Sequence, residues 1–198
     1  MRTIAASCVA AFLVAGCGIG AIFAPAPDDL STWQAVPLAP DAGLSAKAAQ
    51  SPACRPALEQ DVALEVILQD RRTSATAAFL VQGPTMVGSC YISPTGGGGG
   101  SQPAGQLELL DQPISIDEEG SGGADVGTLS YLGGRLGAEA RQVVIEVPGG
   151  RKVTASVGNG HWLAWWPGGA RAERVVASDE AGAQLFALTL GQDGWVAQ

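Results

Sequence analysis

The sequence predicts an all-β protein, an antiparallel β-sandwich, from three observations. The 198-residue chain holds 28 Gly and 12 Pro, which suits closely spaced turns better than a helical bundle. Apolar, β-branched runs recur at about the 8–12-residue spacing of a sandwich or barrel. Asn159-Gly160 is the strongest short hairpin signal, because both central residues of such a turn need positive φ. An immunoglobulin-like strand arrangement is one form that this fold could take.

Three strands are expected after Cys54. Leu64, Val66 and Leu68 alternate with other residues in a run that ends at Asp70-Arg71-Arg72. The second and third runs, the latter carrying Cys90, follow turn-forming residues. The three runs cover 64–69, 75–82 and 86–93, with turns at 73–74 and 83–85.

A helix competes with the strand interpretation at the start of this region. Pro56 suits a first helical turn, and Leu58, Val62 and Glu65 have helical spacing. One short helix near residues 56–61 therefore stays open as an alternative.

Two glycine-rich segments are expected to be loops. Residues 95–105 contain five consecutive glycines but lack the Lys and following helix of a phosphate-binding loop, so a flexible loop or hinge is expected. A strand-like run over 106–116 is interrupted by Pro113. The acidic segment 117–125 lacks the ligand spacing of an EF-hand, which favours a solvated loop.

The C-terminal third carries the clearest strand pattern. Turn residues at Pro148-Gly149-Gly150, Asn159-Gly160 and 179–182 separate apolar runs. The expected strands are 142–147, 152–157, an aromatic strand over 161–168, 173–177 and 184–190.

The N-terminus has the pattern of an export signal. Arg2 is the only charged residue before Asp28, and an apolar run extends from Ile4 to Val14. Val14-Ala15-Gly16-Cys17 resembles a bacterial lipobox. That resemblance implies a signal peptide over 1–16, lipidation of Cys17, and a place outside the cytoplasm, anchored to the outer face of the cell membrane.

Two other modes of export stay open. The uncharged stretch from Ile4 to Ala24 is about 21 residues long, which is enough for an uncleaved membrane anchor. Ordinary cleavage after Ala24 is disfavoured by Ile22 at the minus-three position and by Pro25 after the cut. All three modes place the rest of the chain outside the cytoplasm.

Residues 17–53 are expected to form the lipidated Cys17 and a flexible tether. This segment is rich in Ala, Pro, Ser and Asp and lacks a sustained hydrophobic period. Trp33 is its one large side chain and is expected to pack on the domain or at the membrane interface. The folded β-rich domain is then expected to cover 54–198.

The four cysteines divide between these regions. Cys8 lies in the apolar signal and Cys17 in the lipobox, which leaves Cys54 and Cys90 as an even pair in an oxidising compartment. A disulfide between them would close a loop of about 35 residues, stabilising the fold by roughly 3–4 kcal/mol. With no CxxC and one His, neither a metal site nor another cofactor is predicted.

The charge balance limits the partners. Nineteen acidic residues against 11 basic ones give a formal net charge of −8, and the sequence has no basic stripe. Nucleic acid is therefore not an expected partner, and electrostatic docking on anionic lipid is disfavoured.

The segment from Val153 to Gly168 carries a more specific pattern. Its strand, Asn-Gly turn and Trp-Trp-Pro-Gly ending resemble exported or membrane-anchored proteins of actinobacteria, and Asp70-Arg71-Arg72 and Ser89-Cys90 fit the same pattern. The resemblance covers Cys54 to about Leu188. No activity is assigned to that family, so the resemblance implies an exported domain and nothing about chemistry.

A possible recognition surface is formed by His161, Trp162, Trp165 and Trp166. On a strand, Trp162 and Trp166 share one face while His161 and Trp165 share the other. Exposed Trp rings bind sugars or proteins through a large rigid area, whereas Trp in a sandwich with few other aromatics can equally be core. Recognition through this surface requires Trp162 or Trp166 to be substantially exposed.

The sequence thus favours a lipid-anchored envelope protein that acts as a binding or interaction module. Its partners would be the membrane, through the anchor, and an envelope protein or glycan. The alternatives are a single-pass sensor ectodomain and an exported hydrolase. No catalytic constellation is identified; a hydrolase would need an acid pair or His161 in a real cleft.

Overall fold

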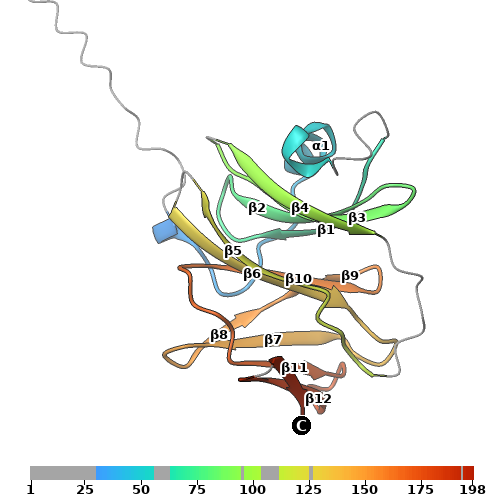
Figure 1. Cartoon of the computed structure of the whole chain (residues 1–198), viewed down its shortest axis with the longest axis vertical. Coiled ribbons are helices and arrows are strands. Elements are labelled where there is room, and N and C mark those ends of the chain that lie inside the picture. Colours follow the sequence, from blue (N-terminus) through green and yellow to red (C-terminus); the bar gives the residue numbers. More distant parts are fainter. Residues whose placement is uncertain (1–29, 56–62, 95, 104–111, 125–126, 193) are drawn as a thin grey trace, which may run out of the picture.

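The computed structural model describes residues 30–55, 63–94, 96–103, 112–124, 127–192 and 194–198. In these ranges the chain forms three antiparallel sheets, one α-helix and two short 3₁₀ helices. The predicted antiparallel all-β sandwich is confirmed. The sheets are stacked in three layers, with the helix on the outer face of the first layer (Figure 1).

Each sheet is built mainly from strands close in sequence. The first sheet has the order β1 (Glu65–Arg71), β2 (Ala77–Gln82), β3 (Met86–Ile92) and β4 (Gly97–Pro103). The middle sheet has the order β5 (Glu118–Ala124), β6 (Gly127–Arg135), β10 (His161–Pro167) and β9 (Ser156–Gly158). The third sheet has the order β13 (Gly194–Ala197), β12 (Gln184–Gly191), β11 (Arg174–Ser178), β7 (Gln142–Val147) and β8 (Arg151–Thr154).

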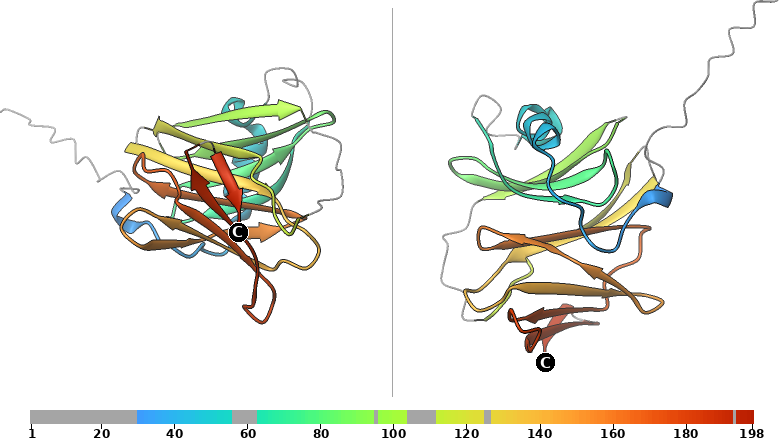
Figure 2. Two further views of the ribbon diagram at one scale, coloured as in Figure 1. Left: turned by 60° about the horizontal axis from the view of Figure 1, so that its bottom comes forward. Right: turned by 180° about the vertical axis from the view of Figure 1, so that it is seen from behind.

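The hairpins expected in the C-terminal third are present. Asn159 has φ of 50° and Gly160 has φ of 72°, as a turn with two left-handed central residues requires, and they connect β9 to β10. Between β8 and β9 only Ala155 intervenes, so one stretch of chain passes from the third sheet into the middle sheet. Figure 2 shows the resulting stack from two further sides.

Both faces of the middle sheet are covered by other sheets, so the Trp side chains of the aromatic strand β10 are buried. From β10, Trp162 and Trp166 pack into the core shared with the third sheet, while Leu163 and Trp165 pack against the first sheet. The three Trp side chains are at most 2% exposed. The Trp side chains are therefore core, and the exposure of Trp162 or Trp166 that recognition through this surface requires is contradicted, because sheets cover both faces of β10.

The segment from Leu30 to Ala53 belongs to the fold, so the predicted tether over 17–53 is wrong in this part. It contains η1 (Leu30–Thr32), α1 (Ala42–Gln50) and η2 (Pro52–Cys54). Asp41 caps α1 by accepting a hydrogen bond from the backbone N–H of Leu44 at 2.9 Å. The alanines of this segment, together with Leu44, Lys47 and Gln50, are good helix formers, and Ala48 is completely buried against the first sheet.

Both glycine-rich segments contain strands where loops were expected. Residues 97–103 form β4 and residues 118–124 form β5, and each strand lies at an edge of its sheet. A Cβ on Gly99 would lie 2.6 Å from the carbonyl oxygens of Ala53 and Ser89. Glycine is thus needed in β4 because η2 packs directly on the strand, rather than because the chain must bend.

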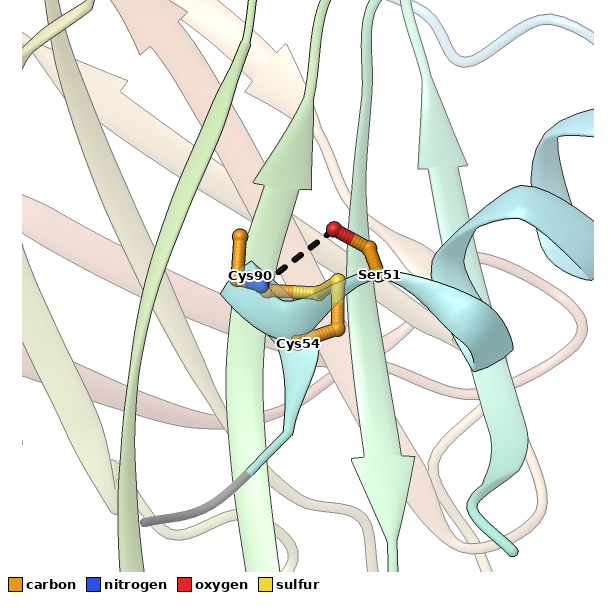
Figure 3. The surroundings of a disulfide bond; sticks show 4 residues. Ser51, Cys54 and Cys90 are labelled. Atoms are coloured by element: carbon orange, nitrogen blue, oxygen red, sulfur yellow. Dashed lines mark hydrogen bonds between the residues drawn. A yellow bond between two sulfur atoms is a disulfide. The ribbon is translucent and has the colours of Figure 1, made fainter. Parts of the chain in front are cut away.

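The predicted disulfide between Cys54 and Cys90 is present (Figure 3). It joins η2 to β3, with the two Cα atoms 5.1 Å apart and both side chains buried. Beside it, the Ser51 hydroxyl accepts a hydrogen bond from the backbone N–H of Ala53 at 3.3 Å. The disulfide therefore fixes the N-terminal segment to the outer face of the first sheet.

A completely buried ion pair lies between the first and middle sheets. Asp70 of β1 accepts a hydrogen bond from Arg72 Nε at 2.8 Å, and both side chains have no exposed area. The same carboxylate accepts from the Ser156 hydroxyl at 2.9 Å and from the backbone N–H of Trp165 at 3.1 Å. Full burial raises the pKa of Asp70, and Arg72 and these hydrogen bonds act against that rise.

The guanidinium of Arg72 holds the N-terminal segment across the stack. It donates to the backbone carbonyl oxygens of Gln34, Ala35 and Thr154. It also lies 5.6 Å from the ring centre of Trp33, whose Nε1 donates to the carbonyl of Trp165 at 3.3 Å. Trp33 packs on the domain, one of the two places expected for it.

Some predictions lie outside the described residues. These are the signal peptide or anchor within 1–24, the lipidated Cys17, and the helix proposed near 56–61. Of the strand-like run 106–116, only residues 112–116 are described, and there Ile114 makes an isolated bridge to Leu136. Among the helices in the described ranges, none has the length and apolarity needed to cross a bilayer.

Candidate functional site

A cavity of about 230 Å³ lies between the first and middle sheets. Its walls come from β3 and β4 on one side and from β5 and β6 on the other, with Trp165 of β10 and Ala78 of β2 also contributing. The cavity is therefore bordered by both glycine-rich edge strands. Its described lining is uncharged and consists of Ala78, Ser89, Cys90, Tyr91, Gly98, Gly99, Ser121, Gly122, Leu129, Tyr131 and Trp165.

The two tyrosines of the chain both line this cavity. Tyr91 of β3 is paired with Gly98 of β4, and Tyr131 of β6 is paired with Gly120 of β5. A Cβ on Gly98 would lie 2.9 Å from the Tyr91 ring, and a Cβ on Gly120 would lie 2.5 Å from the Tyr131 hydroxyl. Each half-buried tyrosine thus lies across the edge strand next to it, which glycine alone permits.

Ser89 connects Tyr131 to a buried carboxyl group. Ser89 makes side-chain hydrogen bonds with both Glu118 and Tyr131. An ionised Glu118 carboxylate only accepts, so Ser89 donates to it, and Ser89, Glu118 and Tyr131 are joined in one hydrogen-bonded relay. The Oε2 atom of Glu118 is buried and has no hydrogen-bond partner within the described part of the chain.

The pKa values of both acidic groups in this relay are raised. Burial is the main cause of the raised pKa of Glu118; the Ser89 hydrogen bond opposes it and the negative charge of Asp117 adds to it. Burial also raises the pKa of Tyr131, with a further contribution from the charge of Glu118. The relay therefore presents a neutral tyrosine and serine to the cavity, suited to hydrogen bonding rather than to nucleophilic attack.

A second cavity, of about 300 Å³, shares Ser121 and Tyr131 with the first. Its charged groups are already paired, because Arg171 donates to the two carboxylate oxygens of Glu119 at 2.7 and 2.9 Å. The hydrogen bond from Arg171 is the main cause of the lowered pKa of Glu119. This cavity offers fewer unpaired groups to a ligand than the inter-sheet cavity does.

The structure does not bring the residues of the predicted recognition surface together at either cavity. His161 is the first residue of β10, directly after the Asn159-Gly160 turn, and its Nδ1 is 2.8 Å from the carbonyl oxygen of Asn159. The buried indole groups are bonded internally; Trp162 donates to Ser115 and Trp166 donates to Ala170. Of the four residues, Trp165 lines the inter-sheet cavity and Trp166 lines the second cavity.

The residues that form the inter-sheet site were not singled out by the sequence patterns. Ser89, Tyr91, Glu118 and Tyr131 lie on three strands of two sheets, so their proximity depends on the stacking. The sequence signal that points to them is the scarcity of tyrosine in a chain with long glycine runs. The two tyrosines point to a site only when the glycine runs are known to form edge strands, because each tyrosine then lies over a glycine of the neighbouring strand.

Comparisons with protein-family models, with curated proteins and with solved structures found no match to this chain. The resemblance to exported actinobacterial proteins therefore stays a prediction.

The raised pKa of Glu118 predicts a pH-dependent gain of stability for Glu118→Gln. A carboxyl group with a raised folded-state pKa contributes stability at low pH that is lost as the pH rises through that pKa. Glu118→Gln should therefore raise the melting temperature at neutral pH. The gain should shrink as the pH falls toward the ordinary glutamate pKa of about 4.3.

Glu119→Gln on the same strand is the matched control, with the opposite sign. In the unsubstituted chain the pKa of Glu119 is lowered. Its carboxylate therefore stabilises the fold at pH values above the ordinary glutamate pKa and loses this effect as the pH falls. Glu119→Gln should lower the melting temperature slightly at neutral pH, because its partner Arg171 is exposed. A pH-independent difference for Glu118→Gln would contradict the burial argument.

Proposed function

We propose that the protein is a lipid-anchored binding module on the outer face of the cell membrane, and that it binds a small uncharged ligand between its first and middle sheets. The observation that carries the proposal is the inter-sheet cavity, in which both tyrosines of the chain meet Ser89 over glycine edge strands. Ligand sites in proteins typically combine such an apolar wall with a few convergent polar groups.

The proposed location is supported by the lipobox-like sequence before Cys17 and by the disulfide. Structural disulfides persist in oxidising compartments, so the Cys54–Cys90 bond fits a domain outside the cytoplasm. Twelve residues, 18–29, separate Cys17 from the first described residue. Fully extended, twelve residues reach at most about 40 Å, which would keep the domain close to the bilayer surface.

Lipidation is tested by the mass and fractionation of the protein expressed with and without Cys17→Ser. The unsubstituted chain should be recovered in membranes with the mass of residues 17–198 plus the lipid, and globomycin should block that maturation. Cys17→Ser should remain at the precursor mass. Membrane recovery with a mass that neither treatment changes would instead support the uncleaved anchor of a sensor ectodomain.

Binding in the cavity is tested with Gly122→Leu. Gly122 lines the cavity and pairs with the inward-facing Leu129, and a Cβ at Gly122 would meet no atom within 4 Å. Leucine at this position should therefore fill the cavity without disturbing the backbone. Ala197→Leu, on the exposed edge strand β13, adds a similar apolar side chain away from the cavity and serves as the control.

The measurement is the thermal shift of the purified full chain, in a detergent without a sugar headgroup, against a library of small uncharged ring compounds. Compounds that stabilise the unsubstituted chain and Ala197→Leu should fail to stabilise Gly122→Leu. Hits that stabilise all three proteins equally would place binding elsewhere and overturn the proposed site.

A further inference from the structure

We propose that the inter-sheet cavity binds the ring of a neutral sugar. This inference rests on the proposed function and names its ligand class. The structural basis is the arrangement of Tyr91 and Tyr131, which come from facing sheets and border one cavity. Each ring covers a glycine on its own sheet, so the two tyrosines form opposite aromatic walls of the space between the sheets.

The cavity selects against charged ligands. Its described lining carries hydroxyl, aromatic and aliphatic groups and backbone, and no charged side chain. The formal net charge of −8 repels anions from the whole surface. A cation would need an available carboxylate, but Glu118 lies behind Ser89, already bonded to its hydroxyl. An uncharged ligand fits these conditions best.

The polar groups of the cavity match the hydroxyl groups of a sugar. Tyr91, Tyr131 and Ser89 supply three hydroxyl groups; the oxygens of all three can accept hydrogen bonds from a sugar, and Tyr91 can also donate one. The relay to Glu118 orients the Ser89 and Tyr131 hydroxyls. A sugar ring has C–H groups that pack on the aromatic walls and hydroxyl groups around its rim, so it satisfies both kinds of surface.

The size and polarity of the cavity narrow the ligand further. A volume of about 230 Å³ lies below that of typical drug-sized pockets, so one ring fits and a folded oligosaccharide does not. A planar apolar ring could contact the same walls, but when it displaced water it would leave the Tyr91 hydroxyl and the remaining acceptor positions of Ser89 and Tyr131 without partners. The cavity therefore favours a single sugar residue, either free or at the end of a glycan.

The experiment measures binding of two matched panels to the full chain by calorimetry. One panel contains methyl glycosides of the common neutral hexoses and pentoses and of N-acetylated hexosamines. The other contains uncharged phenols and indoles of similar size. At least one methyl glycoside should bind with a millimolar or lower dissociation constant, and Gly122→Leu should abolish that binding while Ala197→Leu leaves it unchanged.

Tyr131→Phe separates recognition of hydroxyl groups from general ring packing. It keeps the aromatic wall and removes one hydroxyl, so it should weaken glycoside binding about fivefold. Its effect on any phenol or indole should be within about twofold. A Tyr131→Phe variant that binds the glycoside as well as the unsubstituted chain would contradict the assigned role of this hydroxyl.

The outcomes distinguish the ligand class from the proposed function. If no methyl glycoside binds but a phenol or indole binds in a Gly122-dependent manner, the sugar inference is overturned and the cavity keeps its proposed function. If members of neither panel bind, and the wider library of ring compounds gives no Gly122-dependent hit, both fail. Glycoside binding that Gly122→Leu does not affect also overturns the inference.

Discussion

The buried ion pair between Asp70 and Arg72 holds the N-terminal segment, the first sheet and the middle sheet together. A charged pair without exposed area is stable only when nearly all its hydrogen-bonding groups are satisfied, and here the partners come from three separate parts of the chain. The pairing of β9 with β10 ends at Leu163, and Asp70 accepts the backbone N–H of Trp165 two residues further along. The carboxylate therefore continues an interrupted edge of the middle sheet.

This pair also connects the fold to the proposed site. The indole Nε1 of Trp165 donates to the backbone carbonyl of Asp70 at 2.9 Å, so two hydrogen bonds hold Trp165 to β1. Trp165 is part of the cavity lining. This hydrogen-bonded cluster therefore fixes the spacing between the first and middle sheets. The same spacing determines how far apart Tyr91 and Tyr131 lie.

Local sequence patterns predicted the elements whose cause is local. The strands over 142–147 and 184–190 follow from their apolar runs, and the Asn159-Gly160 turn follows from its positive φ angles. The disulfide was expected because Cys54 and Cys90 are the two cysteines that lie outside the N-terminal apolar segment. The glycine-rich strand β4 and the alanine-rich helix α1 were not predicted, because contacts with residues distant in the sequence stabilise them. A strand with little side chain can persist when η2, the disulfide and Tyr91 pack over it.

The candidate site could not be predicted for the same reason. Tyr91, Ser89 and Glu118 acquire a shared environment only when two sheets stack, and no spacing within one strand records that stacking. The Trp-rich strand was a candidate recognition surface because the sequence pattern is the same whether its Trp side chains are exposed or buried. A third sheet that covers β10 decides between them, since it turns the cluster into core.

The most direct test of the central role of the buried pair is the free energy of unfolding of Asp70→Asn, measured by guanidinium denaturation with Trp fluorescence. Removing the carboxylate charge leaves Arg72 buried and unpaired, which should cost about 3–5 kcal/mol. Asp41→Asn is the control, because it removes a partly exposed ion pair with Arg71 and keeps the helix cap, at a cost below about 1 kcal/mol. Equal, small losses for the two variants would contradict a fold that depends on the Asp70–Arg72 pair.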